Sequence, residues 1–291
     1  MKMKFKKIGV TMLLTLLCAT VLISCGGKSF DENKNISVVT REDGSGTKSA
    51  FMEIIGLKGK NDLKGIIVAT GTAGVMAEVE SNPLALAYES LGFVSGDVKV
   101  LSVDGVAATA ENINNGTYKI ARPLSIVYKE NSLSSATNAA FLNFLKSASA
   151  QSLITSNGYV STQLTPAEYV IESNLQGEIS ISGSTSLQPL MIVLADKFKE
   201  LQSGVSITVS GGGSGTGYKN AQNGVSEFGM ISEEFKSEKA EGCVYYEIAK
   251  DGIAIIVNKS NPIKDISTAN IKAIYDCDGG DAAIFKWSQI G

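Results

Sequence analysis

An arginine, an aspartate and a run of small residues stand together near the start of the chain. Arg41 and Asp43 lie two residues apart, and Asp43 directly precedes the tetrapeptide Gly-Ser-Gly-Thr at 44–47. A guanidinium group can hold an oxyanion through two parallel N–H donors. Residues two apart at a strand end project to the same side, so we expect Asp43 to orient Arg41 and to offset its charge. The alternative, a surface ion pair, would contribute little.

Three junctions between a strand-like run and a helix-like run share this small-residue chemistry, at 43–47, 182–186 and 211–217. The first turn of a helix leaves backbone N–H groups without intrahelical partners and carries about half a positive charge. Such a turn binds small anions. One junction alone indicates only helix capping, because serine and threonine are preferred N-caps. Three junctions together with Arg41 indicate a shared anionic ligand.

Other catalytic and phosphate-binding motifs fit less well. The stretch "GGGSGTGYK" has Tyr218 where a P-loop needs lysine, so no nucleotide site is predicted. Ser45 and Lys48 match the S-x-x-K nucleophile motif, but its partner signatures S-D-N and K-T-G are absent. The chain has no histidine, which excludes Ser-His-Asp and Cys-His catalysis and argues against a zinc site. We expect no metal and no cofactor, and an acyl-transfer enzyme using Ser45 stays an alternative.

The N-terminal residues 1–24 form a basic and then apolar leader. Four lysines precede an uncharged run at 8–24, which is shorter than the roughly 20 residues of a membrane span. A signal peptide is therefore favoured over a spanning helix. The residues "LISC" resemble the bacterial lipobox, in which Cys25 would be acylated, for example with palmitate. The lipid would tether the protein outside the cell membrane without spanning it.

Loss of residues 1–24 removes four lysines from 26 basic and 29 acidic residues and leaves a net charge of −7. A negative net charge argues against a nucleic-acid partner. Cys243 and Cys277 remain after lipidation of Cys25, and a disulfide between them and two buried free thiols are equally compatible with the sequence.

Strand-like and helix-like runs alternate along the chain, which predicts an α/β fold with mostly parallel sheets. Strands are expected at 36–40, 65–70, 84–88, 178–183, 205–210 and 251–262. Helices are expected from Thr47, at 72–80, as one long helix at 136–158, and at 187–204, with a connector at 161–177.

In combination, these segments resemble the phosphate-binding proteins that supply bacterial ABC-type phosphate importers. The matching stretches include "ISISGSTSLQPL", "ITVSGGGSGTGYKNAQ", "DGIAIIVNKSNP" and "ISVVTREDGSGTKSAF". Family members usually begin with the "SGSTS"-like strand and reach "TREDGSGT" in mid-chain. Here the "TREDGSGT" block comes first, which resembles a circular permutation of a two-lobed, type II periplasmic-binding-protein fold.

The resemblance implies the limits of the two lobes. One lobe would be continuous at 99–257, and the other would combine 28–98 with 258–291. The 161–177 connector would join the usual chain ends. Gly291 would then end near the strand that starts at Ile36.

The family's phosphate-contacting roles carry over to matching positions, with Asp43 as the partner of the arginine. The expected contacts are Arg41, Ser45, Gly46 and Thr47 on the split lobe, and Thr185, Ser214 and Ser232 on the continuous lobe. Many members have an aspartate, an acceptor for a phosphate proton, where this chain has Ser232 followed by Glu233. A hydroxyl would repel a fully ionised dianion far less than a carboxylate would. A sulfate-like oxyanion is therefore the alternative ligand.

The resemblance implies a monomeric, non-enzymatic, lipid-anchored binding protein outside the cytoplasm. It would bind inorganic phosphate between its lobes, close, and pass the ligand to the permease subunits of an ABC transporter. A phosphate sensor or surface interaction protein without a transport role is a further alternative.

Overall fold

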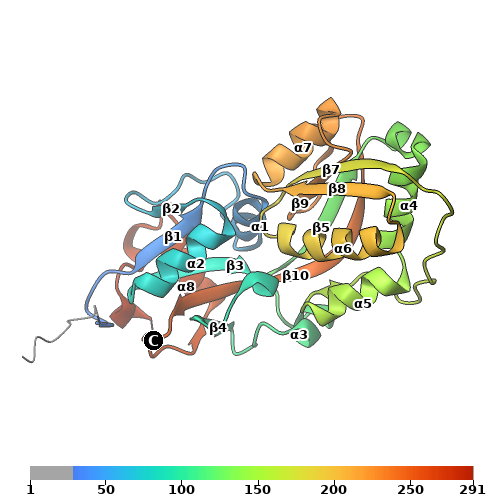
Figure 1. Cartoon of the computed structure of the whole chain (residues 1–291). Coiled ribbons are helices and arrows are strands. Elements are labelled where there is room, and N and C mark those ends of the chain that lie inside the picture. The colour runs from blue at the N-terminus through green and yellow to red at the C-terminus, as the bar shows by residue number, and fades with distance from the viewer. Residues whose placement is uncertain (1–28, 291) are drawn as a thin grey trace, which may run out of the picture.

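The computed structural model describes residues 29–290, so the predicted signal peptide and Cys25 lie outside the described residues. The chain forms two α/β halves that lie end to end, and the long strand β10 (Val244–Asn258) runs from one half into the other (Figure 1). In the part of the chain that the structure describes, none of the helices has the length and apolar content needed to cross a membrane.

The elements follow one another in an alternating α/β order. The strands besides β10 are β1 (Ser37–Arg41), β2 (Ile67–Ala69), β3 (Ala85–Ser90), β4 (Val98–Val103), β5 (Ala121–Tyr128), β6 (Val160–Ser161), β7 (Gly177–Gly183), β8 (Val205–Ser210), β9 (Phe228–Ile231) and β11 (Asp265–Ile266). The α-helices are α1 (Gly46–Ile54), α2 (Gly71–Ser81), α3 (Ala110–Asn114), α4 (Ala136–Leu145), α5 (Ala148–Ser156), α6 (Gln188–Leu201), α7 (Ser214–Asn223) and α8 (Thr268–Tyr275). Short 3₁₀ turns lie at Leu91–Phe93, Glu130–Ser134, Ser237–Lys239, Gly280–Ala282 and Trp287–Gln289.

One mixed sheet passes through both halves in the order β2-β1-β3-β10-β5-β9-β7-β8. Strand β1 is parallel to β2 and β3, and β7 is parallel to β8 and β9. Strand β10 is antiparallel to all its partners: its residues 244–252 pair with β5, and its residues 253–257 pair with β3. The fold is therefore α/β as predicted, but the prediction of a mostly parallel sheet is wrong, because β10 pairs antiparallel with its neighbours in the centre and parallel pairs lie on both sides of it.

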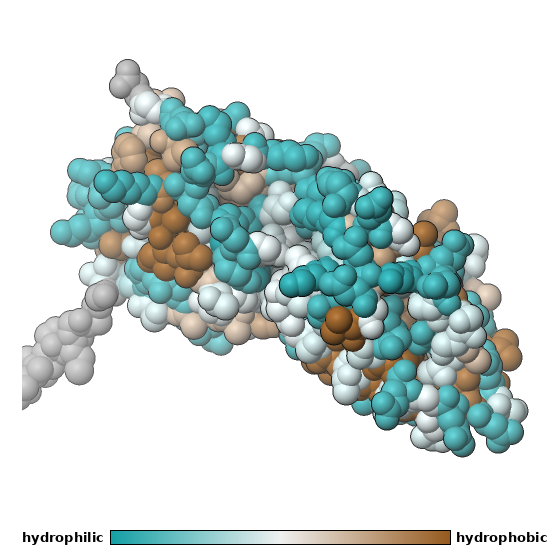
Figure 2. All heavy atoms as spheres, turned by 90° about the horizontal axis from the view of Figure 1, so that it is seen from above, coloured by the Kyte–Doolittle hydropathy of each residue, from teal (hydrophilic) through white to brown (hydrophobic). Residues whose placement is uncertain are grey.

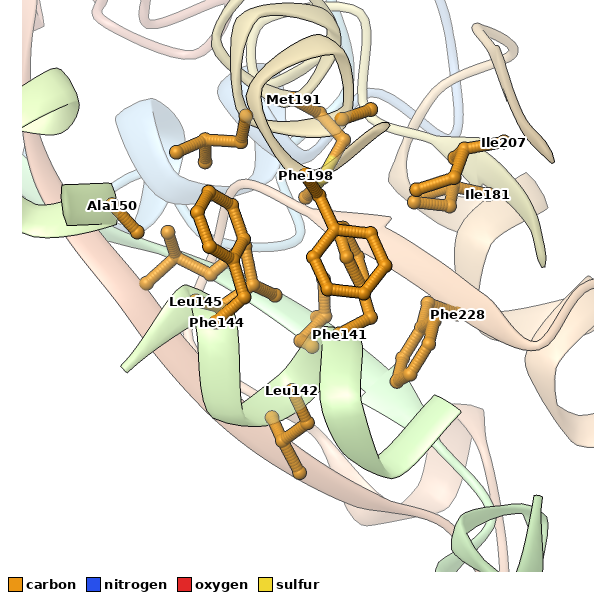
Figure 3. Packing of buried hydrophobic residues seen from close by; sticks show 14 of the residues in the cluster. Phe141, Leu142, Phe144, Leu145, Ala150, Ile181, Met191, Phe198, Ile207 and Phe228 are labelled. Atoms are coloured by element: carbon orange, nitrogen blue, oxygen red, sulfur yellow. The ribbon is translucent and has the colours of Figure 1, made fainter. Parts of the chain in front are cut away.

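Two sets of buried residues define the halves. The core of the first half draws on residues 36–120 and 253–287, with Val160, and includes the stacked rings of Phe51 and Tyr88. The core of the second half draws on residues 124–249. There the rings of Phe141 and Phe198 meet edge to face at 5.2 Å between centroids, as Figure 3 shows.

Two elements differ from the sequence-based expectation. The predicted helix at 136–158 is two helices, because Ser147 begins a new one: its side chain accepts a hydrogen bond from the Ala150 N–H as the N-cap of α5. Strand β10 begins seven residues before the expected start at Asp251. An isolated amphipathic pattern does not reveal an internal cap, and the polar start of β10 hides its extended course.

The core clusters also divide the chain differently from the predicted lobe limits. Leu101, Val103 and Tyr118 pack with the first half, although the continuous lobe was predicted to begin at 99. The reason is pairing: β4 runs antiparallel to β10 at residues 255–258 and parallel to β11. The assignment of lobes stays a prediction.

The two described ends of the chain meet in the first half. The Ile36 N–H donates to the Phe285 carbonyl at 2.8 Å, and the Ser288 N–H donates to the Glu32 carbonyl at 2.8 Å. Trp287 is buried there and its ring meets Phe30 edge to face. The last described residues therefore lie beside the start of β1.

The surface is mostly polar. The face seen from above is largely hydrophilic, and hydrophobic residues gather in separate patches on both halves (Figure 2). The exposed large apolar residues are Val68, Leu164, Val170, Ile171, Ile192, Val225, Val244, Tyr245 and Phe285.

Candidate functional site

Arg41 is the last residue of β1, and its side chain is only 1% exposed. Its Nε and Nη2 donate to the two carboxylate oxygens of Glu42 at 3.0 and 3.1 Å. Its Nη1 donates to Oε2 of Glu89 at 2.9 Å. Burial alone would lower the pKa of Arg41, but the charges of Glu89 and Glu42 raise it above its usual value. The guanidinium is thus a permanently charged group in a fixed orientation.

Glu89 is a residue that the sequence analysis missed. It is fully buried at the end of β3, and its second oxygen, Oε1, accepts from the Ser90 N–H at 2.8 Å and from Ser186 Oγ at 3.2 Å. Strands β1 and β3 are parallel with Val38 opposite Leu86, so three residues further on Arg41 stands level with Glu89. A carboxylate at the end of the apolar run "LALAYES" was the sequence signal that could have found it.

The predicted pairing of Asp43 with Arg41 is wrong. The Asp43 side chain is 98% exposed, and its Oδ1 accepts from Lys48 Nζ at 2.9 Å. Strand β1 ends at Arg41, and Asp43 lies in a turn closed by a hydrogen bond from the Ser45 N–H to the Glu42 carbonyl at 3.2 Å. The alternation of side chains along a strand therefore does not extend to Asp43.

Helix α1 begins inside the Gly-Ser-Gly-Thr tetrapeptide. Ser45 is its N-cap, and its Oγ accepts from the Lys48 N–H at 3.3 Å. Gly46 and Thr47 open the first turn, and all three residues are buried. No acidic residue lies in this first turn, so the positive end of the helix dipole is not neutralised within it.

The Ser182–Ser186 junction of the second half meets this charged region directly. Arg41 Nη2 donates to Thr185 Oγ1 at 2.9 Å, and Thr47 Oγ1 lies 2.8 Å from Ser186 Oγ. Thr72, at the start of α2, adds a hydroxyl 3.2 Å from that of Thr185. Ser186 and Thr72 were not predicted as site residues, although each stands in a small hydroxyl-rich turn.

The third junction supplies Ser214, which meets Ser232 directly after β9. Ser214 is the first residue of α7, after Gly213 at φ 84°, a conformation that favours glycine. The Ser232 N–H donates to Ser214 Oγ at 3.0 Å, and the two hydroxyl oxygens lie 3.4 Å apart. Both side chains are buried, and in the part of the chain that the structure describes neither hydroxyl has a charged partner. This part of the site offers only neutral polar groups.

The starts of α1 and α7 are in close contact. The Gly215 N–H donates to the Gly44 carbonyl at 3.0 Å. A methyl group built on Gly46 would lie 2.2 Å from Ser214 Oγ and 2.8 Å from Ser232 Oγ, so only glycine fits there. The three junctions predicted from sequence therefore converge, and the seven expected contact residues lie at strand ends and helix starts of the two halves.

Glu233, beside Ser232, is turned away from the hydroxyl cluster. Its Oε2 accepts from Ser49 Oγ at 2.5 Å and from Lys236 Nζ at 3.0 Å, and its Oε1 accepts from Lys239 Nζ at 2.7 Å. Lys236 also donates to Glu53 of α1 at 3.2 Å. These bonds join the two halves at the rim of the site.

The possible disulfide is not formed, because Cys243 and Cys277 are both free thiols. Cys243 packs against the second-half core, whereas Cys277 follows α8 in the first half. Within residues 29–290, the acidic and thiol groups close enough to share a cation are Asp276, Cys277 and Asp278, far along the chain from the convergent junctions.

A family model described as "PBP superfamily domain" matches residues 28–149 and 170–291, which is most of the chain. The chain belongs to this family. The match confirms the predicted periplasmic-binding-protein fold, and the two matched stretches flank residues 150–169.

Two relatives of this chain are named as phosphate-binding proteins. This chain is 34% identical over 283 residues to "Phosphate-binding protein PstS 2" of Streptococcus agalactiae, and the alignment covers 94% of this chain and 95% of that protein. It is 33% identical over 284 residues to the protein of the same name from Streptococcus pneumoniae, covering 94% and 96%. These matches confirm the resemblance inferred from the motifs.

A solved structure agrees with these relatives. A phosphate-binding protein of a phosphate ABC transporter from Streptococcus pneumoniae superposes with a TM-score of 0.70 at 31% identity, covering 88% of this chain and 100% of that one. Because the aligned stretches of the two PstS 2 proteins run through nearly the whole of each chain, those relatives share this order of segments. The circular permutation relative to other members stays a prediction.

Proposed function

We propose that this protein binds inorganic phosphate between its two halves, outside the cytoplasm, and delivers it to an ABC importer. The observation that carries the proposal is the convergence of Arg41 with buried hydroxyls and helix starts from both halves. The relatives named as phosphate-binding proteins support the same ligand.

The donors of the site suit a tetrahedral anion. Arg41 Nη2, whose partners are Glu42 and Thr185, offers a charge-assisted hydrogen bond, which contributes about 1.5–3 kcal/mol. The hydroxyls of Thr47 and Ser186 face each other across the two halves. An anion between them would exchange these hydroxyl–hydroxyl bonds for bonds to its own oxygens. Ligand entry and closure would then be one event, as in hinge-closing binding proteins.

Neutral groups would donate most of the hydrogen bonds to the anion. The charge of Arg41 is already offset by Glu42 and by the buried Glu89. Net attraction by formal charge is therefore small at the site, and the mature chain as a whole is negative. Hydrogen bonds from hydroxyls and from the first turns of α1 and α7 would hold the anion instead.

A sulfate-like ligand is the second candidate, because Ser232 is a hydroxyl that can donate to a fully ionised oxyanion. The carboxylate next to it in sequence, Glu233, is bonded to Ser49, Lys236 and Lys239. It is thus not the proton acceptor that would favour phosphate over sulfate.

An acyl-transfer enzyme using Ser45 is disfavoured by the state of Lys48. Lys48 Nζ donates to Asp62 at 2.7 Å and to Asp43 at 2.9 Å. Burial would lower the pKa of Lys48, but the bonds to Asp62 and Asp43 raise it above its usual value. A protonated, paired lysine cannot take a proton from Ser45.

The remaining features of the proposal concern partners and location. A lipid on Cys25 would hold the protein at the outer side of the membrane, and the closed form would contact the permease subunits as a monomer. Labelling with a radioactive fatty acid, with Cys25→Ala as the control, tests the anchor.

Calorimetric titration of the mature protein with phosphate and with sulfate tests the ligand. We expect saturable phosphate binding at micromolar concentration, weaker sulfate binding, and no binding of either by Arg41→Ala. Asp43→Asn is the matched control, because this exposed carboxylate bonds to Lys48 and not to Arg41. Tighter binding of sulfate, or phosphate binding retained by Arg41→Ala, would refute the proposal.

A further inference from the structure

Arginine occurs only twice in this sequence, at 41 and 122, among 26 basic residues. Arg41 belongs to the site described above. Arg122, near the start of β5, is the other, and its side chain is also only 1% exposed. A chain that uses lysine almost everywhere on its surface has thus placed both arginines in its interior, where a planar group with several fixed donors is needed.

Arg122 is paired with Asp251 of β10. Its Nε and Nη2 donate to Oδ2 of Asp251 at 3.3 and 3.0 Å, and the two residues stand directly opposite each other in the ladder. Both side chains are 1% exposed, so neither charge is solvated. The pair lies where the chain passes between cores: Leu124 and Ala249 pack in the second half, whereas Ile120 and Ile253 pack in the first.

The remaining nitrogen of Arg122 reaches the anion site. Its Nη1 donates to the backbone carbonyl of Ser232 at 3.0 Å. The N–H of the same residue donates to Ser214 Oγ. Both backbone polar groups of Ser232 are therefore fixed, one by each residue, and the Ser232 side chain is held facing Gly46 of the first half.

We propose that Arg122 is a positioning residue for anion binding: from the strand pair that joins the two halves, it fixes the Ser232 peptide and thereby aims the Ser232 hydroxyl at the ligand. This inference rests on the proposed function and adds to it a link between the β5–β10 pair and one ligand contact. A twist of β5 against β10 would move Arg122 and, with it, the carbonyl of Ser232.

A lysine at position 122 could not bond to both Asp251 and the Ser232 carbonyl. The guanidinium places different nitrogens on two acceptors, the Asp251 carboxylate and the Ser232 carbonyl. A lysine has one nitrogen at the end of a flexible chain and would follow the carboxylate, which is the stronger acceptor. Arg122→Lys therefore keeps the buried charge pair and releases the Ser232 carbonyl.

A double-mutant cycle between positions 122 and 232 tests the proposal. Ser232→Ala removes the hydroxyl but keeps the carbonyl that Arg122 holds. We expect Arg122→Lys to weaken phosphate binding about tenfold in the natural background, the loss of one well-placed hydrogen bond. In the Ser232→Ala background we expect less than a twofold effect. An equal loss in both backgrounds, or no loss in either, would overturn the proposal.

Tyr118→Phe is the matched control for a purely structural effect. Tyr118 is buried and its hydroxyl donates to the Ile253 carbonyl of β10 at 2.8 Å. The change therefore also removes a bond from a side chain to the backbone of β10, two residues from Asp251. This hydroxyl bonds to the Ile253 backbone and not to a residue of the anion site. We expect Tyr118→Phe to lower the denaturation midpoint without changing phosphate affinity.

A ligand-free measurement separates this inference from the proposed function. Amide hydrogen exchange at Ser232 reports the bond from its N–H to Ser214 Oγ. We expect at least tenfold faster exchange there in Arg122→Lys than in Tyr118→Phe. If phosphate does not bind but exchange at Ser232 accelerates, the positioning role stands and the ligand is wrong. If amide exchange at Ser232 is unchanged in Arg122→Lys while phosphate still binds, the positioning role of Arg122 is wrong and the proposed function stands.

Where Arg122→Lys does not fold, Arg122→Met combined with Asp251→Leu replaces the pair by apolar groups of similar size. Such replacements of buried ion pairs are often neutral for stability. The same cycle with Ser232→Ala then applies, with the same expected outcomes.

Discussion

In the first half of the molecule, the anion site is organised around a buried charge, whereas in the second half it contains only neutral groups. Arg41 is held by Glu42 and Glu89. Among residues 29–290, no charged side chain is bonded to the hydroxyl of Ser214 or of Ser232. Both parts are buried, but ion pairs orient the groups of the first half, whereas hydrogen bonds to neutral groups orient those of the second.

The difference shows how each kind of group is oriented. A buried guanidinium needs carboxylate partners, since an unpaired charge is costly away from water. Neutral hydroxyls need no counter-charge, but their direction depends on the backbone that carries them. In the second half this is provided by Gly213, by the Ser232 N–H bond and by Arg122.

Removing the carboxylate of Glu89, which holds Arg41 in the first half, should cause the largest loss of stability. Glu89→Gln would leave Arg41 with one carboxylate in a site where Glu89 is fully buried. Loss of one partner of a buried ion pair costs about 3–5 kcal/mol, and the amide keeps the shape, so we expect a loss near the lower end of this range. Urea denaturation measures it.

Asp43→Asn provides the contrast for that measurement. It removes a carboxylate of the same turn that is almost fully exposed. We expect a change within the roughly 0.5 kcal/mol typical of surface substitutions. If Asp43→Asn were the more destabilising change, Asp43 rather than Glu89 would be the partner of Arg41.

Blocking the contact between the halves should weaken binding without unfolding either half. Gly46→Ala would place a methyl group 2.2 Å from Ser214 Oγ. Overpacking of this kind costs about 1–3 kcal/mol, so we expect phosphate affinity to fall about 30-fold in calorimetry. Gly74→Ala, a helical position whose added methyl meets only ordinary contacts at 3.7 Å, should leave affinity unchanged.

Giving the neutral half a charge should sharpen its selectivity. In Ser232→Asp, a carboxylate would face the ligand and repel a dianion that carries no proton, whereas protonated phosphate could donate to it. We expect the ratio of phosphate to sulfate affinity to rise about tenfold, or about 1.4 kcal/mol. Ser232→Asn is the uncharged control, and an equal rise in that variant would exclude the electrostatic explanation.

Acid should weaken the pairing of Glu42 with Arg41 in the first half, and only modestly. Burial raises the pKa of Glu42, but its bonds to Arg41 lower it below the usual 4.5. A depressed pKa contributes stability above the unfolded value, and this is lost as pH falls through the folded value. We expect the natural protein to lose stability below pH 4.5 more steeply than Glu42→Gln, as urea midpoints at several pH values would show. Parallel curves would contradict this.

Much of the site could be predicted from the sequence because its elements are local. Small hydroxyl residues and glycine in the sequence indicate a helix start. The three junctions of this kind converge in the structure. The convergence itself was inferred from the family resemblance and from Arg41, since local patterns do not reveal distances between segments.

The partners of Arg41 could not be predicted from spacing. Asp43 is near in sequence, but β1 ends before it, whereas Glu89 is 48 residues away and is brought level by strand register. Arg122 was missed for a similar reason, although the scarcity of arginine was visible in the sequence. Long-range pairing depends on the sheet order, which hydrophobic patterns leave undetermined.

The sharing of one core by both ends of the chain has a consequence for synthesis. The core that begins at Ile36 also needs Ile253, Ile271 and Trp287, which are synthesised after all residues of the second-half core. The second-half core closes with Ala249 and has all its residues sooner. During translation the second half can therefore fold first, and the segment that carries Arg41 completes its core only after residues 253–287 have been made.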